Sequence, residues 1–133
     1  ILLKPTHIYV DVILDLFSKN LIKTCSHITG GGVTENLPRS ISKNTKAVID
    51  LNKWKLPAIF KWISSFNVSQ NEMLRTFNCG YGMVIIIDKK NLNRVRKVIK
   101  KYKFKSDVIG NIEIKKSTNE KSIKFIGRLN FNE

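Results

Sequence analysis

Apolar residues recur along the chain at two spacings, and these spacings predict an alternation of helices and strands. In residues 5–20 they recur every three or four positions, as in a helix with one buried stripe. That stripe consists of Ile8, Val12, Ile13, Leu16 and Phe17. Residues 21–28 then predict a strand. Thr6 stands near the start of the helix, either as its cap or as a hydroxyl of a site.

The middle of the chain predicts a second strand and two short helices. Residues 46–51 form the strand, and a turn at residues 54–57 leads into a helix that runs to Phe66, because proline suits the first helical turn. Ser69 is expected to cap the next helix, with Glu72 completing a capping box. The aromatic residues of this region are expected in the core rather than on a base-stacking surface: Trp54, Phe60, Trp62 and Phe66.

The last part of the chain predicts two more elements and a hairpin. Residues 84–87 are a continuous apolar strand, expected to be buried on both faces and far too short to span a membrane. A helix is expected over residues 91–102. Residues 107–114 and 122–126 then predict a hairpin whose strands are joined by the polar turn 116–121.

These elements predict a single domain of the α/β (α+β) class. The expected architecture is a sandwich in which helices cover a mixed β-sheet. A chain of 133 residues is long enough to bury a real core. The chain has no internal repeat and no low-complexity linker, so we expect one domain over residues 1–133.

Residues 27–32, His-Ile-Thr-Gly-Gly-Gly, carry the strongest chemical signal. The three glycines, Gly30, Gly31 and Gly32, permit positive φ angles and let a ligand approach the backbone. A strand, a glycine loop and a helical turn over residues 33–39 would direct several N–H groups at one spot, which favours an anion such as phosphate. The alternative is a tight turn that needs glycine only for its dihedral angles. His27 and Thr29 lie where ligands collect in open α/β sheets, although a structural histidine is equally compatible with this position.

Residues 77–83 form a second informative segment. Gly80 and Gly82 predict a bulge or a close contact between helix and strand. Asn78 and Cys79 could line a pocket, but no base stands beside Cys79 to make it a nucleophile. Cys79 and Cys25 lack metal-ligand spacing and are expected to be buried thiols.

The composition adds a strong positive charge. Lysine and arginine number 24 against 10 acidic residues, which gives a net charge of +14. Such a balance is typical of nucleic-acid binding. However, lysine is enriched together with asparagine and isoleucine, which is typical of an AT-rich genome. The densest basic tract, residues 89–105, falls on a predicted helix, where it is either a solvated face or a surface that attracts anions.

Several segments taken together resemble the phosphoribosylformylglycinamidine cyclo-ligase (aminoimidazole ribonucleotide synthetase) family. They occur in order and at the family's spacing, and they cover nearly all of the chain: residues 3–10, 27–32, 35–39, 47–50, 72–76 and 77–83, with the region of Trp54. The resemblance is confined to the C-terminal half of the family's enzymes. The sequence departs from the family at His7, where arginine is frequent, and at Ser26, where alanine is usual.

The resemblance implies an ATP-dependent ring closure in purine biosynthesis. The formyl oxygen of formylglycinamidine ribonucleotide is phosphorylated, an internal nitrogen attacks the activated carbon, and phosphate leaves. The products are aminoimidazole ribonucleotide, ADP and phosphate. The full enzyme would use ATP and Mg²⁺, form a homodimer through its N-terminal half and be cytoplasmic, without a nucleic-acid or membrane partner. This domain alone would bind neither ATP nor Mg²⁺ and would be inactive.

The resemblance also assigns roles to residues. His27 and Thr29 are the implied catalytic residues, and no metal ligand is expected in this chain. The implied substrate- and phosphate-binding residues are Gly30, Gly31, Gly32, Asn36, Arg39 and Asn78. If residues 33–39 are helical, Glu35 and Arg39 share a face, and a local ion pair is the simpler expectation for them.

Two other functions remain open at this stage. One is another enzyme of the same superfamily, of the selenophosphate synthetase, hydrogenase-maturation or thiamine-phosphate kinase type. The complete loop with residues 35–39 favours the cyclo-ligase over these. The other is a basic nucleic-acid-binding module, which would explain the charge but neither glycine segment.

Overall fold

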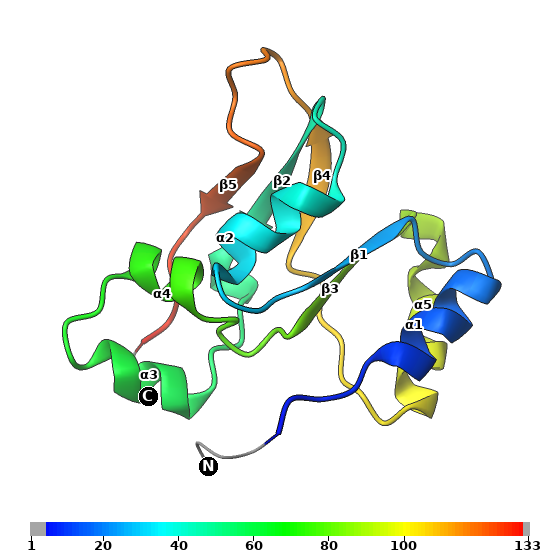
Figure 1. Ribbon diagram of the computed structural model, residues 1–133, viewed down its shortest axis with the longest axis horizontal. Helices are drawn as coiled ribbons and strands as arrows, with labels where there is room; N and C mark the ends of the chain where they lie inside the picture. The colour runs from blue at the N-terminus through cyan, green and yellow to red at the C-terminus, as the bar shows by residue number, and fades with distance from the viewer. Residues whose placement is uncertain (1–4, 132–133) are drawn as a thin grey trace.

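A two-stranded antiparallel ribbon divides the molecule, of which the computed structural model describes residues 5–131. Strand β1 (Thr24–His27) pairs with β3 (Met83–Ile86), so that His27 lies opposite Met83. Figure 1 shows the ribbon crossing between helices α1 and α5 at one end and α3 and α4 at the other. The strand expected over residues 84–87 is therefore present, and only Val84 within it is fully buried.

A three-stranded mixed sheet lies beside the ribbon. Its central strand is β2 (Thr45–Asp50), with β4 (Gly110–Ile114) antiparallel on one edge and β5 (Ile123–Ile126) parallel on the other. The α/β class with a mixed sheet is confirmed. The expected hairpin is wrong, because β4 and β5 each pair with β2 and are separated by it. Four consecutive residues of β2 are buried, as suits a strand with neighbours on both edges.

The helices have the following bounds. The α-helices are α1 (Val10–Ser18), α2 (Gly32–Asn36), α3 (Ala58–Ser64), α4 (Gln70–Thr76) and α5 (Leu92–Lys101). The described residues also contain three 3₁₀ turns: η1 (Leu37–Ser40), η2 (Leu51–Lys53) and η3 (Lys89–Asn91). Within residues 5–131, none of these helices has the length and apolar character needed to cross a bilayer.

Two expectations about helix ends have different outcomes. Ser69 does cap α4, since its hydroxyl accepts a hydrogen bond from the Glu72 amide at 3.3 Å. The first helix begins at Val10 rather than near residue 5, so Thr6 is not its cap. The ring of Tyr9, which immediately precedes α1, stacks on Phe104 with centroids 5.4 Å apart.

The core consists of two hydrophobic clusters, one on each side of the ribbon. Val84 and Ile86 of β3 pack into the cluster around Trp54, whereas Ile85 and Ile87 pack into the cluster between α1 and α5. Side chains alternate across a strand, so the apolar run serves both clusters. Packing on both faces of this strand is thus confirmed, although Ile85, Ile86 and Ile87 are only partly buried.

The aromatic residues in and just after α3 were expected in the core, but Trp62 and Phe66 are exposed. Trp62 is 55% exposed and Phe66 is 64% exposed. Their rings pack edge to face at 5.0 Å on the surface. The helix is short and contains no fully buried residue, so its apolar residues outnumber the positions that can face the core.

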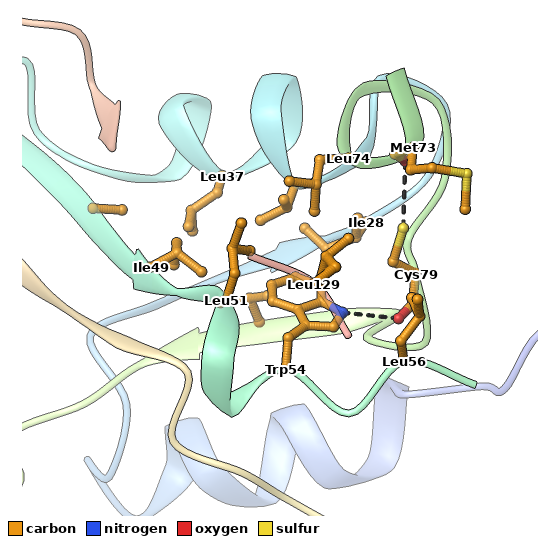
Figure 2. Packing of buried hydrophobic residues seen from close by; sticks show 13 residues of the cluster. Ile28, Leu37, Ile49, Leu51, Trp54, Leu56, Met73, Leu74, Cys79 and Leu129 are labelled. Atoms are coloured by element: carbon orange, nitrogen blue, oxygen red, sulfur yellow. Dashed lines mark hydrogen bonds between the residues drawn. The ribbon is translucent and has the colours of Figure 1, made fainter. Parts of the chain in front are cut away.

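Trp54 is buried at the centre of the larger cluster, and Figure 2 shows the polar contacts that it organises. Its indole N–H donates to the Cys79 carbonyl at 2.9 Å, and the Cys79 thiol contacts the Met73 carbonyl at 3.4 Å. Cys79 has φ of +48°, so this turn requires support from its surroundings. Burial raises the pKa of the Cys79 thiol to about 12, which keeps it neutral and unreactive.

The indole hydrogen bond should contribute measurably to stability. Replacing Trp54→Phe removes the donor and leaves the Cys79 carbonyl unpaired in the core, so we expect a loss of about 1–3 kcal/mol in the free energy of unfolding, measured by urea denaturation. Trp62→Phe is the matched control, because the same change at an exposed position should alter stability by less than about 0.5 kcal/mol. Equal effects of the two substitutions would show that the hydrogen bond is unimportant.

An ion pair of a buried lysine connects the segment between β4 and β5 to the sheet. Lys46 of β2 is 8% exposed and pairs with Glu120, and a second carboxylate, Glu113, lies 4.0 Å away. Glu120 also accepts hydrogen bonds from the backbone N–H groups of Lys116 and Ser117. The Lys46 ammonium, followed by the Lys116 amide, lowers the pKa of the Glu120 carboxyl below its usual value of 4.5.

This shift makes the contribution of Glu120 dependent on pH. Because its pKa is lower in the folded state, the stabilisation is complete above pH 4.5 and is lost as the pH falls through the folded-state pKa. We expect Glu120→Gln to lower the urea midpoint at pH 7 and to weaken the loss of stability on acidification. Glu113→Gln is the control and should follow the unsubstituted chain. Parallel acid profiles for Glu120→Gln and the unsubstituted chain would contradict this role.

Candidate functional site around the glycine loop

The loop between β1 and α2 is held by its own backbone and by one side chain. Gly31 and Gly32 both adopt positive φ, +94° and +56°, and the Gly32 amide donates to the Thr29 carbonyl at 3.0 Å. The Asn36 amide nitrogen donates to the Gly30 carbonyl at 3.1 Å and the Gly32 carbonyl at 2.8 Å. Asn36, identified as a substrate-binding candidate, therefore holds the loop with its nitrogen and has its side-chain oxygen left for a ligand.

The three glycines meet different requirements. A Cβ on Gly32 would lie 2.1 Å from the Leu74 carbonyl oxygen, so only glycine fits where α2 begins against α4. Gly31 needs its left-handed backbone, and the Glu35 side chain fills the space beside it. Gly30 has neither requirement, because its φ is not positive and a Cβ there would meet nothing within 4 Å. The fold alone therefore does not explain glycine at position 30.

An acidic side chain joins two arginines beside the loop. Glu35 lies 3.9 Å from Arg39, which confirms the expected local pair, and 3.4 Å from Arg75 of α4. Both arginine side chains are largely exposed, and such surface pairs contribute little energy. Their planar guanidinium groups can therefore turn to an anion such as carboxylate or phosphate. Sequence reasoning missed Arg75, although its place in the last turn before residues 77–83 was a signal.

A small cleft adjoins the loop. It has a volume of about 230 Å³ and is lined by Ile28, Thr29, Phe60, Thr76, Phe77 and Asn78. The cleft brings together Thr29 and Asn78, two predicted site residues from distant parts of the sequence. The Asn78 side-chain oxygen accepts a hydrogen bond from the Gly80 amide at 2.9 Å, so its NH₂ group is the part that can donate to a ligand.

Aromatic rings form the apolar side of this cleft. The centroids of Phe60 and Phe77 lie 5.9 Å apart. Neither ring was identified as a site residue from the sequence, and nothing in the local pattern around Phe60 distinguishes it from a core residue. The cleft therefore combines an apolar wall with a hydroxyl and an amide, as ligand pockets commonly do.

His27 lies at the end of β1 and is exposed, but it does not line the cleft. Its imidazole packs against the Tyr9 ring with centroids 5.7 Å apart. Within residues 5–131, no three His, Cys, Asp or Glu side chains are close enough together to hold a metal ion. A more open hollow of about 520 Å³, lined by Lys55, Arg96 and Asp107 among others, contains none of the predicted site residues.

Comparison with known proteins places this chain in a family. Residues 1–121 match the family described as AIR synthase related protein, C-terminal domain. A phosphoribosylformylglycinamidine cyclo-ligase of Neisseria gonorrhoeae is 50% identical over 93 residues, which cover 69% of this chain and 27% of that relative. The matched part of the chain thus spans about a quarter of the relative's length. With the family match extending over most of its length, the chain belongs to the AIR synthase related protein C-terminal domain family.

Proposed function

We propose that this chain is the C-terminal domain of a phosphoribosylformylglycinamidine cyclo-ligase and that its glycine loop and cleft bind formylglycinamidine ribonucleotide. The name of the 50% identical relative supports the reaction. The observation that carries the binding role is Gly30, which the fold does not require and which lies open. Its neighbour Gly31 packs against Glu35, and Glu35 pairs with two guanidinium groups. A missing side chain at such a position suits the close approach of a ligand to the backbone.

The proposed reaction closes an imidazole ring. When bound, ATP supplies the phosphoryl group that turns the formyl oxygen of the ribonucleotide into a leaving group. An internal nitrogen then attacks the formyl carbon, and phosphate departs with that oxygen, giving aminoimidazole ribonucleotide. On this proposal ATP and Mg²⁺, which bridges nucleotide phosphates to one or two carboxylates, would be held by an N-terminal half of the same polypeptide, which would also form the homodimer.

The residues of this chain would bind and orient the ribonucleotide. Loop amides of Gly30 and Gly31, with Arg39 and Arg75, would neutralise an anionic oxygen, because guanidinium groups match the geometry of phosphate. Glu35 would hold both guanidinium groups close to the loop until the ligand arrives. Such positioning and charge neutralisation are what phosphoryl transfer chiefly requires.

The cleft would hold a neutral part of the same molecule. The Thr29 hydroxyl and the Asn78 NH₂ group would form its hydrogen bonds, and the Phe60 and Phe77 rings would exclude water. His27, two residues before Thr29, would donate to the substrate or transfer a proton at the edge of the site. On this proposal the enzyme works in the cytoplasm, and the domain without its N-terminal half is inactive.

Alanine at position 30 tests the binding role. In the complete polypeptide we expect Gly30→Ala to raise the KM for the ribonucleotide at least about tenfold, or about 1.4 kcal/mol, because the methyl group occupies the ligand's approach. Its free energy of unfolding should change by less than about 0.5 kcal/mol. Gly32→Ala should instead destabilise the protein, because its Cβ would collide with the Leu74 carbonyl. The measurements are ribonucleotide-dependent ADP release and urea denaturation.

Asn93→Ala, on the exposed side of α5, is the control and should leave both quantities unchanged. Unaltered kinetics for Gly30→Ala would reduce the loop to a structural turn. If the unsubstituted polypeptide releases no ADP with this ribonucleotide, the cyclo-ligase proposal is wrong, and the related ATP-dependent enzymes of the superfamily become the better hypothesis.

A further inference from the structure

Four rings meet at the end of the β1–β3 ribbon, beside the glycine loop. The Tyr9 ring contacts the other three, lying 5.4 Å from Phe104, 5.7 Å from His27 and 6.3 Å from His7 between centroids. His7 also packs edge-on against Phe104 at 5.5 Å. These residues come from three separate segments of the chain, so the cluster is a product of the tertiary fold. None of its contacts was used in the binding role described above.

Tyr9 is held in place from two sides. One face of its ring stacks on Phe104, with the ring planes 28° apart. Its hydroxyl lies over Gly82, where a Cβ would be only 2.4 Å from the oxygen. Gly82 does not have a positive φ, so its backbone does not demand glycine. Glycine at this position is explained by the space that Tyr9 occupies.

Gly82 also connects Tyr9 to the strand that carries His27. Its carbonyl accepts a hydrogen bond from the Ile28 amide at 2.9 Å, and the next residue, Met83, pairs with His27 across the ribbon. The Tyr9 ring therefore lies directly over the end of β1. Its edge-to-face contact with the imidazole has an interplanar angle of 69°. Such aromatic pairs have a preferred geometry and resist rotation of the rings.

The His27 imidazole has little else to hold it. It is exposed, and in the described part of the chain no hydrogen bond to its ring nitrogens accompanies the Tyr9 contact. An unrestrained surface histidine samples several rotamers, which is unsuitable for a group that must meet a substrate atom. The Tyr9 contact thus supplies the restraint that a hydrogen bond commonly supplies to a functional histidine.

We infer that Tyr9 is a positioning residue, which orients the His27 imidazole toward the bound ribonucleotide through its ring rather than through its hydroxyl. This inference rests on the proposed function of the site. Burial raises the pKa of Tyr9, so the phenol is neutral at pH 7 and does not compete with His27 as a base. Phe104 and Gly82 would affect His27 only indirectly, because they fix the position of the Tyr9 ring.

The test combines two readouts on the complete polypeptide labelled with ¹³C-histidine. The His27 Hε1 resonance, assigned by its loss in His27→Gln, reports the ring contact, and steady-state kinetics of ADP release report catalysis. We expect Tyr9→Phe to retain both. Tyr9→Leu should shift the resonance and lower kcat by about 10²-fold with little change in KM, as expected when a catalytic group is misplaced but ground-state binding is kept. Gly82→Ala should act in the same direction by displacing the ring.

Tyr102→Leu is the matched control, since Tyr102 packs against the same α1–α5 cluster and its hydroxyl bonds Asp15, away from His27. It should move neither the resonance nor kcat. An unshifted His27 resonance in both Tyr9→Leu and Gly82→Ala overturns the inference whatever the kinetics. A shifted resonance with unchanged kcat also overturns it. Absence of ribonucleotide-dependent ADP release in the unsubstituted polypeptide overturns the proposed function itself, and the resonance still decides whether Tyr9 orients His27.

Discussion

The close approach of the Gly32 backbone to the end of α4 sets the geometry of the whole site. The Leu74 carbonyl occupies the place where any other residue at position 32 would have its Cβ. The Thr34 hydroxyl donates to the same carbonyl at 3.0 Å, which adds a hydrogen bond between α2 and α4. Because α4 leads directly into Phe77 and Asn78, this junction also determines how the cleft lies relative to the glycine loop.

The position of the turn after Asn78, next to the cleft, depends on Trp54. The indole hydrogen bond to Cys79 anchors the turn that follows Asn78, and the Asn78 side chain in turn accepts from the Gly80 amide. The loop and the turn are therefore both attached to the larger hydrophobic cluster, and the hydrogen bond from the Ile28 amide to the Gly82 carbonyl joins them to each other. Ligand groups placed on such rigid supports need little reorganisation on binding. Packing of the fold requires Gly32, whereas the proposed ligand binding requires Gly30. The same substitution should therefore affect stability at position 32 and ligand binding at position 30.

The elements that sequence reasoning located well are those fixed by local interactions. Ser69 caps its helix and Glu35 pairs with Arg39, because both contacts lie within one helical turn. The hairpin was wrong because strand pairing depends on distant residues. Turn-like polar residues separate β4 from β5, but the buried strand β2 pairs with both. Trp62 was assigned to the core because an apolar pattern does not reveal how many positions a short helix can bury.

The candidate site also divides into features that the sequence predicts and features that it does not. The segments that form the site could be identified from the sequence, whereas the roles of the individual residues in those segments could not. Three adjacent glycines look alike in a sequence, and only the structure separates the one required by packing from the one that the fold leaves open. Arg75 and Tyr9 were missed because their partners, Glu35 and His27, are far away along the chain. Residues 3 and 4, the start of a segment that resembled the family, lie outside the described residues.

Hydrogen–deuterium exchange of the complete polypeptide, with and without formylglycinamidine ribonucleotide, would test the location of the site most directly. We predict that the ribonucleotide slows exchange in peptides covering residues 27–36 and 75–82, because the ligand would cover the loop, the end of α4 and the cleft between them. Unchanged exchange in these peptides, with protection instead at residues 52–55 and 107–108 around the larger hollow, would contradict it.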